Sequence, residues 1–253
     1  MSGHNNLVIE LVGVFCSGKT VSQEIIINTL QKEYPDIKKA QEAIDLYINN
    51  LTFVKLSCRF PNFIYNLIYR LAEHFLIFYY FLLSFENYAI LHKRELKIIF
   101  KEKQKLRALY SYIGKLGRRF FIKNKIPGTI LLDEGATQLV YSLFLREDYS
   151  DEIDFNEIEY YLNYFPLPDI LYHFPSPPAE EIIKRLKSRG LKRLNKYINR
   201  INSNSNTDSN LILINNFVAK SIQIQNHLLK ILNNNNNLLL YSSETIINGN
   251  NNG

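Results

Sequence analysis

Short apolar runs alternate with longer amphipathic stretches along this chain, and Gly, Pro or Asn separates many of them. The expected strands share runs of four to six apolar or alternating residues, namely 7–12, 51–56, 129–133, 169–174 and 238–241. The expected helices share apolar positions at helical spacing, namely 19–33, 36–47, 62–83, 135–145, 155–165, 177–188 and 211–232. This alternation predicts an α/β fold, in which helices cover both faces of a parallel sheet.

A helical insertion of about residues 57–126 interrupts this alternation between the second and third expected strands. Its first part, 62–83, is rich in aromatic residues, but Arg70 and Glu73 interrupt the apolar run. A membrane-spanning helix needs about 20 predominantly apolar residues. We therefore expect a buried helix of the core here, and no transmembrane span.

The second part of the insertion, residues 93–125, carries twelve Lys or Arg and two acids. Leu96, Ile99 and Ile113 recur at helical spacing, so we expect one long helix with a solvated cationic face. Two alternatives stay open. The cations could meet an anionic substrate as part of a lid, or they could bind nucleic acid or an anionic membrane surface.

The length and composition of the chain limit the number of domains, the compartment and the charge of a ligand. The 253 residues suffice for a single domain with one substantial core. Two cysteines give no disulfide framework, and no secretory signal pattern precedes the first strand, so we expect a cytoplasmic protein. The net charge of +6 favours an anionic ligand. Residues 199–210 are polar and of low complexity, which predicts that about 189–210 form a mobile loop or lid.

The most specific signal is the sequence GVFCSGKT at residues 13–20, between the first expected strand and the first expected helix. It matches G-x-x-x-x-G-K-[ST], a loop whose backbone N–H groups bind phosphates at a helix N-terminus. Lys19 would reach the terminal phosphates, and the Thr20 hydroxyl would ligate Mg²⁺. The expected phosphate-binding set is Gly13, Val14, Phe15, Cys16, Ser17, Gly18, Lys19 and Thr20.

A pair of acids follows the third expected strand. The carboxyl ends of parallel strands share one rim, so Asp133 would lie near Thr20 and hold Mg²⁺ directly or through water. Glu134 has two candidate roles. It could act as a general base on a water or a substrate hydroxyl, or it could position the substrate.

Several arginines follow the fourth expected strand. Arg185 and Arg189 lie four residues apart near the end of the expected helix 177–188, and Arg193 follows in a basic loop. Such an arrangement suits a lid that brings guanidinium groups onto a transferring phosphate. A solvated basic helix end is the alternative.

Three segments together resemble the thymidylate kinase and nucleoside/nucleotide kinase group of the P-loop NTPase superfamily: GVFCSGKT, ILLDEG at 130–135, and PDILYHFPSPPAEEIIKRLKSRG at 168–190. The resemblance implies a three-layer P-loop NTPase-type sheet, binding of ATP and Mg²⁺, and γ-phosphoryl transfer. It also implies lid roles for Arg185, Arg189 and Arg193. Thymidylate kinases carry Asp-Arg where this chain has Asp133-Glu134, and Glu134 suits an uncharged hydroxyl acceptor.

Two functions follow from these observations. The first is an ATP-dependent kinase that transfers the γ-phosphoryl group to a nucleoside, nucleotide or sugar. The alternative is a nucleotide-dependent ATPase or switch, in which Glu134 activates water and the basic segment 93–125 binds nucleic acid or a protein. A nucleotide-binding module on an anionic membrane is a third possibility.

Overall fold

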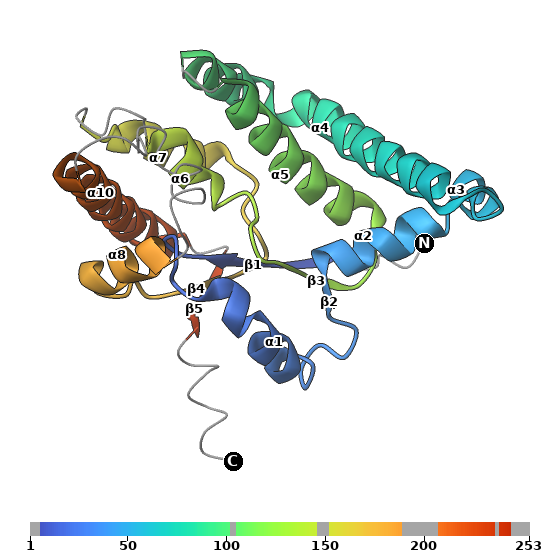
Figure 1. Cartoon of the computed structure of the whole chain (residues 1–253), viewed down its shortest axis with the longest axis horizontal. Helices are drawn as coiled ribbons and strands as arrows, with labels where there is room; N and C mark the ends of the chain where they lie inside the picture. Colours follow the sequence, from blue (N-terminus) through green and yellow to red (C-terminus); the bar gives the residue numbers. More distant parts are fainter. Residues whose placement is uncertain (1–5, 102–104, 146–151, 189–206, 236–237, 244–253) are drawn as a thin grey trace.

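A computed structural model describes residues 6–101, 105–145, 152–188, 207–235 and 238–243 (Figure 1). Its centre is a five-stranded parallel sheet in the order β2-β3-β1-β4-β5. The strands are β1 (Leu7–Val12), β2 (Lys38–Lys39), β3 (Thr129–Leu132), β4 (Ile170–His173) and β5 (Leu239–Ser242). The expectation of an α/β fold with a parallel sheet is confirmed.

The central strands are buried on both faces, which explains why they are continuous apolar runs. Every residue of β1 after Leu7 is buried, and so is all of β3. Their register aligns Val8 with Ile130 and, on the other side of β1, Ile9 with Ile170. The carboxyl ends of β1, β3 and β4 therefore lie side by side.

Helices cover both faces of the sheet (Figure 1). One face packs on α1 through a cluster that includes Ile26, Ile27 and Leu30, and the opposite face packs on the other helices. The described helices are α1 (Lys19–Leu30), α2 (Ala40–Asn49), α3 (Thr52–Ser57), α4 (Asn62–Lys101), α5 (Lys105–Lys125), α6 (Leu139–Phe144), α7 (Phe155–Tyr164), α8 (Ala179–Ser188) and α10 (Thr207–Asn233).

The prediction of a second strand at 51–56 is wrong. These residues begin the helix α3, in which Val54 and Ser57 are buried three positions apart while Phe53 and Leu56 are exposed. The residues of this segment favour a strand by propensity, but the packing of one face of α3 against its neighbours decides the structure. The second strand of the sheet is the short edge strand β2, so the helical insertion extends over 40–128 instead of 57–126.

The insertion also departs from two further expectations. The basic segment 93–125 forms the end of α4 and all of α5 instead of one long helix. The segment 62–83 is helical but only partly buried. Tyr80 and Phe81 of α4 lie in the core, whereas Phe63 is 72% and Phe75 is 67% exposed. The cause is that α4 packs along one side only, against α5 and its neighbours.

The remaining boundaries shift slightly. The helix expected from residue 135 begins as α6 at Leu139, because the backbone of Thr137 and Gln138 first binds the Glu10 carboxylate. The helix expected over 211–232 begins at Thr207, so the last residues of the expected loop 199–210 are helical. The rest of the expected loop or lid, 189–206, lies outside the described residues.

Candidate nucleotide-binding site

The loop 13–20 leaves the end of β1 and enters α1, as the sequence predicts. Gly18 is the N-cap residue of α1, has φ 100° and no side chain caps the helix within the described residues. The first N–H groups of a helix have no acceptor inside the helix. With the positive end of the helix dipole, they form a site suited to an anion.

Glycine is required at both ends of the loop. At Gly18 the φ value is positive, a conformation that residues with a Cβ rarely adopt, and a Cβ there would point into open space. At Gly13 the reason is close packing, because a Cβ would lie 2.9 Å from the Phe174 Cβ and from the Ser17 Oγ. The loop thus passes tightly over the end of β4.

The Ser17 hydroxyl belongs to the same loop and is buried. Its Oγ finds no hydrogen-bond partner within the described chain. Buried polar groups nearly always have a partner, which can be a protein group, an ordered water or a ligand. An acceptor oxygen of a bound phosphate would satisfy this hydroxyl, so the residues present fit the nucleotide that the motif implies.

Lys19 lies inside the loop and is only 9% exposed. Its Nζ donates to the carbonyl of Gly13 at 2.7 Å and to that of Val14 at 3.2 Å. Burial lowers the pKa of Lys19 to about 8, and the nearby carboxylates of Glu134 and Asp133 oppose that lowering. The loop thus holds an ammonium group whose charged form an added anion would stabilise further.

Asp133 and Glu134 directly follow β3, the neighbour of β1 in the sheet. Glu134 is 60% exposed and pairs with Lys115 of α5 at 3.4 Å. Both carboxylates act on the charge of Lys19, so the expected rim is assembled from segments more than a hundred residues apart in sequence.

A divalent cation would have few protein ligands here. The described residues contain no group of three or more His, Cys, Asp or Glu that could hold a metal ion. Asp133 and the Thr20 hydroxyl are the candidate ligands, and the side chain of Thr20 lies outside the described residues. Phosphate oxygens of a nucleotide would have to complete the coordination, as Mg²⁺ sites of this kind require.

Arg185 of α8 reaches the loop from the far part of the chain. Its Nη1 donates to the carbonyl of Cys16 at 2.8 Å, while its Nε donates to Glu181 at 2.8 Å. Of the three expected lid arginines, Arg185 therefore contacts the loop. Arg189 and Arg193 lie outside the described residues.

Two glutamines that the sequence analysis did not identify form hydrogen bonds with the backbone of the loop 13–20. Gln138 contacts both backbone groups of Gly13. Gln225 of α10 accepts from the Val14 N–H at 2.8 Å and donates to the Phe174 carbonyl at 2.7 Å. A lone glutamine gives no sequence signal, because its role depends on contacts far along the chain.

A buried acid holds the turn that follows Glu134. Glu10 lies in the middle of β1 and is fully buried, and it accepts from the N–H of Thr137 at 2.6 Å and of Gln138 at 3.3 Å. Burial raises the pKa of Glu10, while the nearby charge of Arg119 opposes the rise. An acid within an apolar strand was the signal that could have identified this residue.

The strand order also favours this rim as a ligand site. The connection after β1 leads to β2 on one side of the sheet, whereas the connection after β4 leads to β5 on the other. In open α/β sheets, ligands bind outside the carboxyl ends of the strands at such a reversal. Residues 13–20 lie at this point, next to the end of β4.

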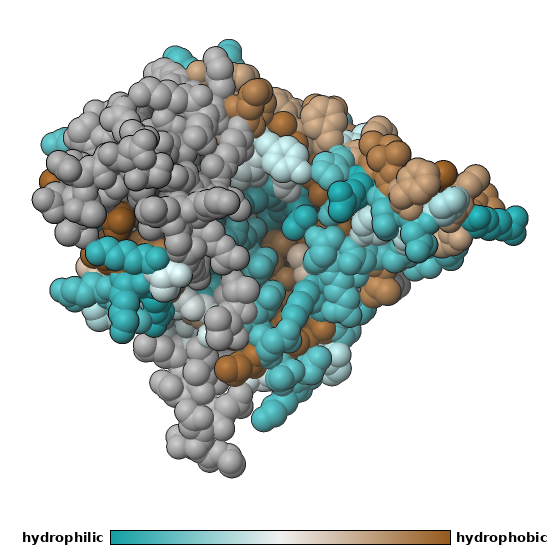
Figure 2. Space-filling view, in the orientation of Figure 1, coloured by the Kyte–Doolittle hydropathy of each residue, from teal (hydrophilic) through white to brown (hydrophobic). Residues whose placement is uncertain are grey.

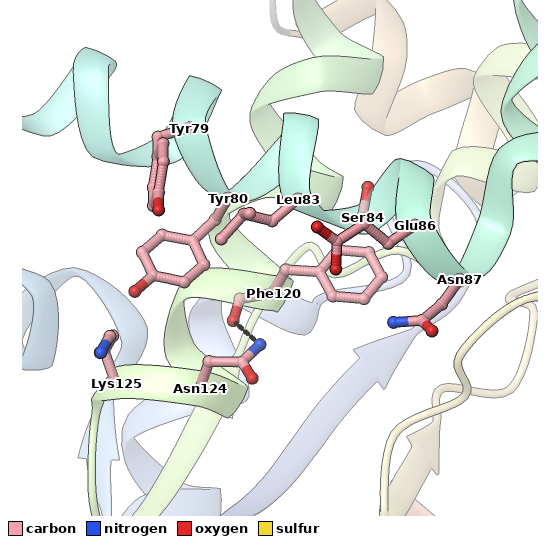
Figure 3. Close-up of a pocket in the computed structure, with 9 residues that line it drawn as sticks. All are labelled: Tyr79, Tyr80, Leu83, Ser84, Glu86, Asn87, Phe120, Asn124 and Lys125. Carbon is pink, nitrogen blue, oxygen red and sulfur yellow. Dashed lines mark hydrogen bonds between the residues drawn. The ribbon is translucent and has the colours of Figure 1, made fainter.

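A separate pocket of about 340 Å³ lies between α4 and α5, lined in part by Tyr80, Glu86 and Asn124 (Figure 3). On α5, Lys115 contacts Glu134, but Lys123 pairs with Asp169 just before β4. The helix thus runs from the carboxyl ends of the strands toward their amino ends. Asn124 lies about 13.5 Å further along α5 than Lys115, so this pocket lies toward the amino ends of the strands, away from the loop 13–20.

Comparisons with known proteins add nothing to this geometry. No family model, no curated protein and no solved structure matches the chain.

Proposed function

We propose that this chain binds a nucleoside triphosphate at residues 13–20 and transfers its γ-phosphoryl group to a small hydroxyl acceptor. One observation carries the proposal. The buried ammonium of Lys19 lies inside a loop that matches the whole phosphate-binding pattern, and it lies within reach of the charges of Asp133 and Glu134. A P-loop kinase needs these groups at one rim, and the resemblance to the nucleoside/nucleotide kinase group supports the same assignment.

The binding roles follow from the fit of the loop. The uncapped N-terminus of α1 would bind phosphate oxygens, Ser17 would donate its unsatisfied hydroxyl, and Lys19 would neutralise the terminal phosphates. Asp133 and Thr20 would hold Mg²⁺, which when bound would offset negative charge on the β- and γ-phosphates. ATP is the nucleotide that the resemblance implies.

Cations from two further elements would act on the transferring group. Arg185 already donates to the loop, and a shift of its side chain would bring the guanidinium to a phosphate. Lys115 is held at the rim by Glu134. Arg189 and Arg193 would be further lid groups, as the resemblance to the kinase group implies.

Glu134 is the candidate residue for orienting or deprotonating the acceptor hydroxyl. Its side chain is exposed at the rim and pairs with Lys115, and a carboxylate can accept the proton of a hydroxyl. A carboxylate here would repel an acceptor phosphate but would orient an alcohol. This favours nucleosides or sugars over nucleotides as acceptors.

The alternative ATPase or switch function needs a basic surface for a partner. In the described part of 93–125, several cations instead have internal partners. Arg94 pairs with Glu157, Arg118 with Glu73 and Lys123 with Asp169. Arg119 is buried and donates to backbone carbonyls. These contacts leave fewer free charges for nucleic acid, so the kinase is the better-supported function.

The test is ATP consumption by the purified chain against nucleosides, nucleotides and sugars, with a reaction that lacks acceptor as the reference. We expect turnover that depends on one acceptor class and is lost in Lys19→Ala. Lys32→Ala, at the exposed far end of the α1 region, is the matched control and should keep full activity. Turnover that needs no acceptor would favour the ATPase. Absence of ATP binding by the folded wild-type chain would reject both functions.

A further inference from the structure

The outer face of α4 is apolar and exposed over five helical turns. Its members lie three or four residues apart and are 48–72% exposed: Phe63, Leu67, Leu71, Phe75, Phe78 and Leu82. This outer stripe is about 29 Å long, from the helical rise over 19 residues. The hydrophobic residues are visible along the upper right margin of the molecule, over α4 (Figure 2).

The apolar surface continues beyond the start of the helix. Phe53 and Leu56 of α3 and Phe60 of the following turn are each more than half exposed, and α3 packs beside α4. Single exposed apolar residues are normal, but a contiguous patch of this size marks an interaction site.

The inner face of α4 is fixed to the body of the protein. Tyr80 and Phe81 are buried, and Glu73 pairs with Arg118 of α5 at 3.4 Å. At Gly117 the backbone of α5 comes so close that a Cβ would overlap the carbonyl oxygen of Ile77. The helix therefore has one face in the protein core and one that no described residue covers.

The exposed charged side chains of residues 52–82 have one sign. Between residues 52 and 82 the exposed charged residues are Lys55, Arg59 and Arg70, and the single acid, Glu73, is paired with Arg118. The next exposed acid, Glu86, lies one turn beyond Leu82. A second copy of the chain would bring like charges together, whereas an anionic lipid surface complements them.

We propose that the outer stripe docks this protein on the surface of an anionic membrane. The leucines and phenylalanines enter the boundary between headgroups and acyl chains, and Arg59 and Arg70 contact the lipid phosphates. The helix Asn62–Phe100 is the described segment that is long and apolar enough to span a bilayer. A spanning position would carry the Glu73–Arg118 pair and the attached α5 into the hydrocarbon, so the helix lies parallel to the surface.

The chain contains no tryptophan, so one introduced indole reports its own position. We expect the fluorescence of Phe75→Trp to shift to shorter wavelength with vesicles containing phosphatidylglycerol, and much less with phosphatidylcholine alone. Tyr164→Trp, 59% exposed on α7, is the control and should not shift. Leu67→Trp and Leu82→Trp lie about 22 Å apart along the axis. Brominated lipids should quench both at the same shallow depth; quenching at very different depths would contradict a parallel helix.

Vesicle co-sedimentation tests the side chains directly. The double variant Leu71→Gln with Phe75→Gln should bind anionic vesicles at least tenfold more weakly, and Ile212→Gln, 60% exposed on α10, should bind like the wild type. Arg59→Gln with Arg70→Gln should lose the preference for anionic lipid. Circular dichroism and ATP titration of the same variants establish that they are folded. Vesicle binding that the double variant leaves unchanged would overturn the proposal. The proposal would also be overturned if the wild type were a dimer that does not bind vesicles and that the double variant dissociates.

Discussion

The side-chain amide of Gln138 contacts both backbone groups of Gly13. Its Nε2 donates to the Gly13 carbonyl at 3.1 Å, and its Oε1 accepts from the Gly13 N–H at 3.4 Å. The backbone N–H of Gln138 in turn donates to the Glu10 carboxylate. One residue thus connects the turn after Glu134 to the first residue of the loop 13–20.

We predict that Gln138→Leu loosens this connection. The substitution keeps much of the volume but leaves the buried Gly13 N–H without its side-chain acceptor, which costs about 1–3 kcal/mol. The Gly13 carbonyl loses the Gln138 donor but keeps the bond from the Lys19 ammonium. We expect a lower free energy of unfolding in urea and weaker binding of ATP with Mg²⁺ in calorimetric titration. Gln41→Leu, an exposed glutamine of α2, is the control. If Gln138→Leu unfolds and binds ATP as the wild type does, the connection has no role in the site.

A second prediction concerns the pH dependence of nucleotide binding. The pKa of Lys19 is lowered to about 8 by burial, so the free protein loses the Lys19 proton as the pH rises through 8. A bound phosphate stabilises the ammonium and raises its pKa, so binding above pH 8 takes up a proton. We expect ATP affinity to fall between pH 8 and pH 9.5. Calorimetry at pH 8.5, in two buffers of different ionisation enthalpy, measures the proton uptake.

Lys19→Arg provides the matching control for this prediction, because an arginine stays charged throughout this range. Its affinity can be lower at every pH, but it should show no loss specific to the range above 8. Equal pH profiles for the wild type and Lys19→Arg would mean that another group controls binding.

The parts of this structural arrangement that the sequence predicts correctly are those encoded locally. The eight residues 13–20 contain the whole loop, and the neighbouring strand β1 is a continuous buried apolar run. Asp133 follows an equally buried strand, β3, and parallel pairing then brings the two ends together. Each of these inferences needed only a short window of sequence and the geometry of parallel sheets.

The parts that sequence reasoning missed depend on distant contacts. Gln225 binds the Val14 N–H across 211 positions, and Lys115 meets Glu134 because α5 crosses the rim. The edge strand β2 consists of Lys38–Lys39, so no apolar pattern in the sequence predicts it. The segment 51–56 has strand-like composition, but burial of Val54 on one side of α3 favours the helix.

A third prediction concerns stability. Glu95 of α4 is fully buried, and neither carboxylate oxygen has a hydrogen-bond partner in the described structure. Burial raises its pKa to about 8, with a further rise from the charge of Glu157. In the unfolded chain the pKa is near the ordinary 4.5. Between these two values the folded state binds the extra proton, so this group makes the protein less stable as the pH rises.

Glu95→Gln removes this titration while keeping the shape of the side chain. Relative to the variant, the wild type should lose up to roughly 1.4 kcal/mol of stability for each pH unit between about 4.5 and 8. The measurement is urea unfolding of both proteins at pH 5, 6, 7 and 8. Glu86→Gln, an exposed acid of the same helix, should leave the slope unchanged. Parallel curves for the wild type and Glu95→Gln would show that the buried carboxyl is ionised throughout.

The last prediction separates binding from chemistry at Arg185. Its guanidinium donates to the Cys16 carbonyl and is held by Glu181, so it lies beside the loop without being part of the cradle. If it acts on the transferring phosphate, Arg185→Gln should lower kcat by about 10²–10³-fold, the cost of losing one such electrostatic group, while ATP affinity changes only a few-fold. Steady-state kinetics and ATP titration measure the two effects, with Lys187→Gln, an exposed cation of the same helix, as the control. A loss of ATP affinity equal to the loss of turnover would instead assign Arg185 to ground-state binding of the nucleotide.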